Sequence, residues 1–254
     1  MMKKVKIYVA MHKNAIFPKC SIYVPIQVGA KGKEKLTKVT DDVLDNISVK
    51  NPNFCELTAT YWIYKNDKSD IVGLTHYRRY FFKDNPKGID DVLDKKDVLN
   101  ILNDYDIIVP QKTYFVRYKN MKNAYKKLHN EKDLIECRNI IMEKYPEYID
   151  AFDKVMSDRS FYAFNMFISR KELFDSYYKW LFDILFELES RIDISSYDDY
   201  NKRIFGFLSE RLFNVWLKYQ DLKIKEIMVY NSEEDFKKQN FKFKFINMLF
   251  DRGR

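Results

Sequence analysis

The sequence is poor in cysteine, glycine and proline, and it has no long apolar run. Its three cysteines, Cys20, Cys55 and Cys137, are widely spaced and form no CxxC pair, which excludes a disulfide framework and a zinc ribbon. Six glycines and six prolines in 254 residues argue against long flexible linkers. No stretch approaches the roughly 20 apolar residues of a membrane-spanning helix, and residues 7–10 are too short for a signal-peptide core. We therefore expect a cytoplasmic protein with reduced thiols.

The composition is that of a folded domain with a moderate positive charge. A hydrophobic fraction of 46% with 17% aromatic residues supports a sizeable core. The net charge of +8 suits an anionic ligand or an anionic membrane surface. A basic and aromatic run at 114–122 has the residue types that bind single-stranded nucleic acid, but the chain has no RNA-binding signature. We expect no nucleic-acid partner.

Strand and helix patterns alternate along the chain. Apolar runs predict strands over the following segments: 5–10, 71–74, 106–109, 161–169 and 223–229. Helical periodicity predicts helices over the following segments: 54–65, 95–103, 121–145, 171–191 and 200–218. Residues 11–49 are polar and irregular, and we expect them to form a long functional loop. The order predicts one α/β domain with no interior boundary.

The segment 70–82 carries the clearest functional signal. The apolar run 71–74 delivers His76, Arg78 and Arg79 to the carboxyl end of a strand, which is where ligands bind in open α/β sheets. Arginine pairs bidentately with phosphate oxygens and keeps its charge. The segment therefore predicts binding of a nucleoside diphosphate, although a solvated turn has the same spacing.

The chain resembles, over residues 3–230, the DUF4422 group of bacterial glycosyltransferases found in capsule, exopolysaccharide and cell-wall glycan gene clusters. The pieces that carry the resemblance are, in order, 7–13, 25–30, 45–48, 51–59, 73–81, 106–110, 165–168 and 203–211. The resemblance implies a GT-A-like, Rossmann-related domain over 1–235, with a mixed central sheet flanked by helices and a helical C-terminal part. It also implies transfer of a sugar, with galactofuranose among the candidates, from a UDP-sugar to a glycan or polyprenyl-linked acceptor.

Two short segments fit the nucleotide part of such a donor. The first strand ends in Ala10, His12 and Lys13, where a base or ribose rests in a sheet of this kind. Gly29 and Ala30 offer backbone amides without bulk for close approach to a ligand, although Gly29 also suits an ordinary turn.

No divalent metal cofactor is expected. Many GT-A enzymes hold a cation with an Asp-x-Asp at a strand end, but residues 74–79 contain no carboxylate. Arg78 and Arg79 can neutralise the leaving diphosphate instead. Asp104 and Asp106 precede a strand rather than follow it, which places them at the wrong edge of the sheet and leaves metal binding there as the less favoured alternative.

Inverting transfer needs a group that takes the proton of the acceptor hydroxyl. The candidates are the following: Glu210, His76, Asp198 and Asp199. Glu210 is flanked by aromatic residues, and partial burial there would raise its pKa, although an ion pair with Arg203 or Arg211 is equally compatible with the sequence. Glu56, near a helix start, either bonds loop amides as a structural carboxylate, which we favour, or contacts the donor.

The remaining candidates concern the acceptor and the membrane. His129, Asn165 and Met166 are candidates for sugar contacts, with a surface histidine and a core strand as the alternatives. Residues 236–254 form a basic amphipathic tail, which predicts either peripheral contact with anionic lipid or a last element docked on the domain. A non-catalytic module that binds a nucleotide sugar or a glycan is the alternative function, and turnover would distinguish it from an enzyme.

Overall fold

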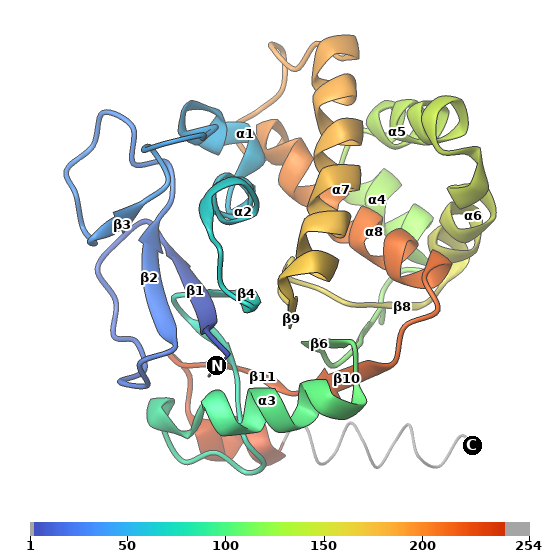
Figure 1. The fold of residues 1–254 in the computed structure, drawn as a ribbon. Helices are drawn as coiled ribbons and strands as arrows, with labels where there is room; N and C mark the ends of the chain where they lie inside the picture. The colour runs from blue at the N-terminus through green and yellow to red at the C-terminus, as the bar shows by residue number, and fades with distance from the viewer. Residues whose placement is uncertain (1–2, 242–254) are drawn as a thin grey trace, which may run out of the picture.

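A nine-stranded mixed sheet forms the centre of the fold in the computed structural model, which describes residues 3–241 (Figure 1). Along its main path the strands are, in spatial order, β10 (Ile224–Ile227), β6 (Ile107–Pro110), β9 (Ile168–Arg170), β4 (Ile71–His76), β1 (Val5–Met11), β2 (Tyr23–Gln27) and β3 (Val39–Thr40). β5 (Arg79–Phe81) and β11 (Val229–Asn231) pair at its side, and β7 (Thr113–Tyr114) pairs with β8 (Ser160–Phe161) in a separate ribbon. β9 runs antiparallel to β4 and β6, whereas the other pairs of the main path are parallel.

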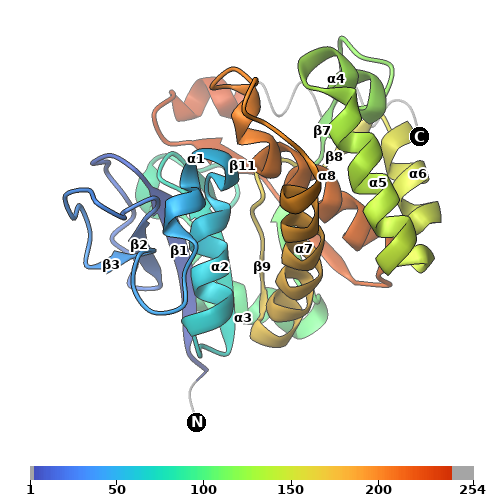
Figure 2. The same cartoon turned by 90° about the horizontal axis from the view of Figure 1, so that it is seen from above.

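Helices cover both faces of this sheet. They are α1 (Asn51–Phe54), α2 (Leu57–Asn66), α3 (Lys95–Asp104), α4 (Met121–Leu128), α5 (Glu131–Lys144), α6 (Ile149–Ser157), α7 (Lys171–Arg191) and α8 (Ile204–Tyr219). Residues 3–241 also contain the 3-10 turns η1 (Ser48–Lys50), η2 (Ile89–Asp91), η3 (Pro146–Tyr148) and η4 (Asn201–Arg203). Figures 1 and 2 show α2, α7 and α8 on one face, α3 on the other, and α4 to α6 packed outside α7 and α8. The predicted α/β fold with a mixed, mostly parallel sheet is confirmed, and the arrangement is consistent with a GT-A-like domain.

The two faces of the sheet build two hydrophobic cores. Along β1, Tyr8 and Ala10 belong to the core under α2, α7 and α8, whereas Ile7 and Val9 belong to the core under α3. A strand buried on both faces is expected to be apolar at almost every position, and β1 has this character.

Several predicted elements are confirmed by local signals. The helix predicted over 171–191 is α7 with these same bounds. α3 begins where Asp94 accepts hydrogen bonds from the backbone amides of Lys96 and Asp97, and the side chain of Asp97 bonds back to the Asp94 amide.

The structure corrects the sequence analysis at several segments. The expected loop 11–49 contains β2 and β3, and β2 pairs in parallel with β1 along its length. The helix predicted over 54–65 is interrupted at Cys55, whose φ is 53°. The strand predicted over 161–169 is broken by turn residues, and the helix α6 was not predicted. In each case tertiary contacts override the local pattern.

The parallel strands β1, β2 and β4 end at the same edge of the sheet. Their register aligns Ala10 with His76 and with Ile26, so the segments that follow these strands lie together. Phe236 packs against Phe82 and Tyr230 at the core under α3. Residues 242–254, which make up most of the predicted tail, lie outside the described residues.

Candidate active site

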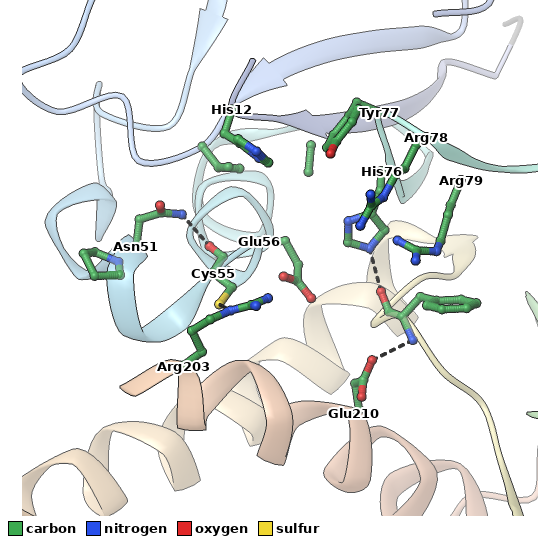
Figure 3. Close-up of a pocket in the computed structure, with 14 residues that line it drawn as sticks. His12, Asn51, Cys55, Glu56, His76, Tyr77, Arg78, Arg79, Arg203 and Glu210 are labelled. Carbon is green, nitrogen blue, oxygen red and sulfur yellow. Dashed lines mark hydrogen bonds between the residues drawn. The ribbon is translucent and has the colours of Figure 1, made fainter. Parts of the chain in front are cut away.

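A cleft of about 660 Å³ opens at the carboxyl edge of β1 and β4 (Figure 3). Its walls come from the ends of these strands, the junction of α1 and α2, the turn before β9, and the η4–α8 segment. The lining residues are Ala10, His12, Val28, Asn51, Pro52, Cys55, Glu56, His76, Tyr77, Arg78, Arg79, Phe164, Arg203 and Glu210. The fold thus brings together Ala10, His12, His76, Arg78, Arg79 and Glu210, which the sequence analysis had selected from distant segments.

Among the described residues, no carboxylate contacts the guanidinium of Arg79 directly, although the charges of Glu210 and Glu234 attract it at longer range. Within residues 3–241 its guanidinium has no hydrogen-bond or ion-pair partner, and it lies 4.6 Å above the ring of Phe164. Burial and the neighbouring charge of Arg78 lower the pKa of Arg79. The guanidinium of Arg78 lies 3.9 Å from the carboxylate of Glu233, which makes a long and weak ion pair. A half-buried, unpaired guanidinium in a cleft favours binding of an anion.

Positive charges surround His12, and Glu233 offsets two of them, since it lies 3.7 Å from Lys13 and 3.9 Å from Arg78. Burial first, and then the charges of Lys13, Arg78, Lys33 and Arg203, lower the pKa of His12. The Lys13 side chain does not line the cleft, but its ammonium lies 5.0 Å from the ring centroid of Tyr77, which does. Four cations around one imidazole, at the carboxyl edge of a parallel sheet, suit a phosphate-bearing ligand.

The backbone of Phe164 connects two candidate proton carriers. Nε2 of His76 donates to the carbonyl oxygen of Phe164 at 2.7 Å, and the amide of Phe164 donates to Oε1 of Glu210 at 2.9 Å (Figure 3). Phe164 and Asn165 have φ values of 77° and 50°, a conformation that costs non-glycine residues on the order of 1–3 kcal/mol each. Since a carbonyl only accepts, a neutral His76 has its proton on Nε2 and its lone pair on Nδ1.

Glu210 is a largely buried carboxylate with a raised pKa. Its side chain is 24% exposed, and Oε2 accepts a hydrogen bond from Nη1 of Arg211 at 3.0 Å. Burial raises the pKa of Glu210, and the Arg211 charge and the Phe164 amide offset part of this effect. The two sequence-based alternatives for Glu210, a raised pKa and an ion pair with Arg211, therefore occur together.

A second carboxylate, Glu56, faces the same cleft. Its side chain caps no helix amide but accepts a hydrogen bond from a turn residue, so both alternatives, a structural carboxylate and a donor contact, stay open. Nδ2 of the buried Asn165 donates to Oε1 of Glu56 at 2.8 Å and to the carbonyl of Gly206 at 3.2 Å. Asn165 itself does not line the cleft, but it holds in place Glu56, which does. Met166 is fully buried in the core under α3 and does not reach the cleft.

The amides of Gly29 and Ala30 are already bonded within the protein. They donate to the two carboxylate oxygens of Asp41 at 2.7 and 3.0 Å, so they do not face a ligand as the sequence analysis expected. Asp41 is fully buried and also accepts a hydrogen bond from Ser48 at 2.6 Å. This network anchors the loop after β2 beside Asn51, which lines the cleft.

The sequence analysis missed part of the cleft wall. Arg203 donates through Nε to Sγ of Cys55 at 3.3 Å, and its guanidinium lies 5.4 Å from the ring centroid of Phe207. Asn51 donates to the carbonyl of Cys55 at 2.8 Å. These residues lie within the motifs 51–59 and 203–211, but their residue types alone do not indicate a site.

Two further candidates lie outside the cleft. Asp199 is fully exposed and is 3.9 Å from Lys202. His129 lines a separate pocket with Asp198 and Asn201.

The described residues 3–241 contain no group of three or more His, Cys, Asp or Glu side chains that could hold a metal ion. Asp106 accepts from the amide of Lys223 at 2.9 Å at the start of β6. Because β9 is antiparallel to both β4 and β6, those two strands are parallel, and Asp106 lies at the edge opposite the cleft.

Of the helices that the structure describes, none has the length and apolarity to cross a membrane.

A family model described as "Domain of unknown function (DUF4422)" matches residues 6–221. The apo structure of WbbM, a bifunctional glycosyltransferase, superposes with a TM-score of 0.83 at 32% sequence identity. The match covers 91% of this chain and 46% of that one, so the chain spans about half the length of WbbM. The search of curated proteins found no match.

Proposed function

The chain belongs to the DUF4422 family, and from this membership and the chemistry of its cleft we propose that it is a glycosyltransferase that uses a nucleoside diphosphate sugar. The observation that carries the proposal is the half-buried, unpaired guanidinium of Arg79 beside Arg78 at the carboxyl edge of β4. The similarity to WbbM supports the reaction class. A UDP-sugar, with galactofuranose as one candidate, is the donor we propose from the family resemblance.

In this proposal the two arginines bind the diphosphate. Arg79 supplies a guanidinium that makes no direct hydrogen bond or ion pair within residues 3–241, and Arg78 exchanges its weak contact with Glu233 for a phosphate oxygen. His12 and Ala10, at the end of β1, lie where the nucleoside would rest. The same two charges stabilise the diphosphate as it leaves, which gives a reaction that does not depend on a divalent metal.

We propose Glu210 as the base of an inverting transfer. The oxygen of the acceptor hydroxyl forms a bond to the anomeric carbon, and the bond from that carbon to the diphosphate oxygen breaks. The electron pair of the broken bond stays on the diphosphate, and the hydroxyl proton moves to the Glu210 carboxylate. His76 bonds the Phe164 carbonyl and so positions the turn whose amide orients Glu210. Glu56, at the junction of α1 and α2, contacts the transferred sugar from that wall of the cleft.

The acceptor we propose is a glycan, free or linked to a polyprenyl carrier. The basic and aromatic composition of residues 236–254 would favour an anionic membrane surface, where such a carrier lies. Co-sedimentation with anionic and neutral vesicles tests this part separately from the reaction.

Calorimetric titration with UDP in EDTA tests the donor site. Arg79→Ala is expected to weaken UDP binding by about 10- to 150-fold, which corresponds to about 1.5–3 kcal/mol for a charge-assisted hydrogen bond. Arg117→Ala, in which an exposed arginine outside the cleft is removed, is the matched control. Equal affinities in wild type and Arg79→Ala would remove the central claim. Binding of UDP-sugars without transfer to any acceptor would instead support a non-catalytic binding module.

A further inference from the structure

A second pocket of about 380 Å³ lies on the other side of η4 from the cleft. The 3-10 turn is a shared wall, because Arg203 lines the cleft and Asn201 lines the second pocket. The remaining lining residues of the second pocket include His129, Asn130, Tyr197 and Asp198. No part of the proposed donor chemistry uses this pocket.

A stack of rings connects the two pockets. The guanidinium of Arg203 lies over Phe207, and the ring of Phe207 stacks on His129 with centroids 4.2 Å apart. His129 in turn stacks on Tyr200 at 5.8 Å, with an interplanar angle of 14°. Tyr200 is 51% exposed. Tyr200 also packs on Phe207, with centroids 5.0 Å apart, so the three rings form a cluster that reaches from the cleft wall to a solvent-exposed ring beside the second pocket.

His129 is held as a neutral imidazole that donates one hydrogen bond within the protein. Asn201 donates through Nδ2 to the Asp198 carboxylate at 3.3 Å, which turns its Oδ1 toward Nδ1 of His129 at 3.3 Å. Since that oxygen accepts, Nδ1 carries the proton and Nε2 keeps a lone pair. Burial and the charge of Arg211 lower the pKa of His129 to about 4, so the ring is uncharged at neutral pH.

The chemistry of the second pocket differs from that of the cleft. Its wall carries two amide side chains, a phenol hydroxyl and one charge of each sign, Lys127 and Asp198. Asn130 donates to the Tyr197 hydroxyl at 2.6 Å, and that hydroxyl donates to the buried Asp133 at 2.8 Å, so this wall is held in place. Balanced charge, amides and exposed aromatic surface suit an uncharged ligand with many hydroxyl groups rather than a phosphate.

We propose that the second pocket binds a neutral sugar residue of the acceptor glycan, adjacent to the residue that receives the new sugar in the cleft. This inference rests on the proposed function, since it takes the cleft as the site of transfer. It makes the preferred acceptor an oligosaccharide rather than a single sugar.

The three histidines of the chain report on the two pockets separately. His12 and His76 line the cleft, and His129 lines the second pocket. In protein labelled with ¹⁵N-histidine, UDP is expected to shift the signals of His12 and His76. Neutral di- and trisaccharides of galactose, glucose, mannose, rhamnose and N-acetylglucosamine are the second probe, and at least one of them is expected to shift the His129 signal.

Variants then test the pocket itself. Tyr200→Ala is expected to weaken the oligosaccharide titration about tenfold, as loss of one ring contact predicts, and to leave the UDP titration unchanged. Tyr219→Ala is the control, because it removes a tyrosine of similar exposure that packs on Tyr148 at the far end of α8. It is expected to change neither the oligosaccharide titration nor the UDP titration.

The outcomes separate the two proposals. A response of His12 and His76 to UDP, with no response of His129 to any of the oligosaccharides, would overturn the second pocket as a sugar site and leave the donor site standing. No response of His12 and His76 to UDP would overturn the proposed function. Equal oligosaccharide titrations for Tyr200→Ala and Tyr219→Ala would also overturn the inference.

Discussion

His76 and Glu210 are linked through a single residue, Phe164, whose carbonyl accepts from the imidazole at 2.7 Å and whose amide donates to the carboxylate at 2.9 Å. The two side chains come from β4 and α8, which are far apart in the sequence. Phe164 has a positive φ, and these two bonds help to hold it there. Each of the two side chains therefore supplies one of the bonds that hold this turn.

Replacing Glu210 with Gln should remove the base and keep the shape of the site. We expect kcat to fall by about 10²–10⁴-fold, the usual contribution of general base catalysis. UDP affinity should stay within about twofold, because the arginines that bind the diphosphate are untouched. Steady-state kinetics with calorimetry measures both. Unchanged turnover would move the role of base to Glu56 or His76, and Glu56→Gln in the same assay separates these two.

The acid side of the activity profile should report Glu210. Burial raises its pKa, so its base form is lost on acidification at a pH above the ordinary glutamate value of about 4.3. We expect kcat/KM to fall with an apparent pKa above that value, and the residual activity of Glu210→Gln to lack this limb. An acid limb that persists in the variant would assign the titration to another group.

Two glycines with similar backbones should respond differently to alanine. Gly29 and Gly32 have φ values of 59° and 73°, and alanine at either position carries strain of roughly 1–2 kcal/mol. A Cβ at Gly29 would lie 2.4 Å from Oδ1 of Asn51, whereas nothing lies within 4 Å of one at Gly32. Gly29→Ala should therefore lower the melting temperature further and weaken UDP binding. Equal losses of melting temperature and of UDP affinity in the two variants would contradict a role for the contact with Asn51.

The Asp67 carboxylate should make stability depend on pH. Burial alone would raise its pKa, but hydrogen bonds from Lys6 and Tyr8 outweigh burial and lower it to about 2. Because the pKa is depressed in the folded state, this stabilisation is present above about pH 4 and is lost as the pH falls toward 2.

We expect Asp67→Asn to lower the free energy of unfolding by about 2 kcal/mol at neutral pH, and the difference to narrow on acidification. Denaturant melts at several pH values measure this quantity. Asp221→Asn, at an exposed carboxylate, is the control. If the free energy of unfolding of Asp67→Asn is lower than that of the wild type by the same amount at every pH, packing rather than charge accounts for the loss.

Much of the sheet and part of the cleft could be predicted from local pattern. The apolar runs of β1, β4 and β6, the periodicity of α7, and the placement of Arg78 and Arg79 after a buried strand follow from side-chain alternation and from the direction of the chain. Glu210 could be selected by its residue type and aromatic neighbours. Glu56 could be named only as one of two alternatives, and Arg203 only as an ion-pair partner of Glu210. Phe164 could not be selected, because it reaches the cleft from a segment whose own pattern indicates only a strand.

The sequence by itself thus determined the α/β class and the cationic edge, because both depend on residues that are neighbours along the chain. Only the tertiary structure decided where the chain departs from its local preferences. β2 forms in a polar segment because β1 offers it a complete set of parallel partners. Phe164 and Asn165 adopt positive φ because contacts with distant residues offset the backbone strain, and at Cys55 a hydrogen bond from Asn51, four residues earlier, does so. The amides of Gly29 and Ala30 bond the buried Asp41 rather than a ligand, and η4 separates His129 from the cleft, since packing rather than spacing sets which side chains meet.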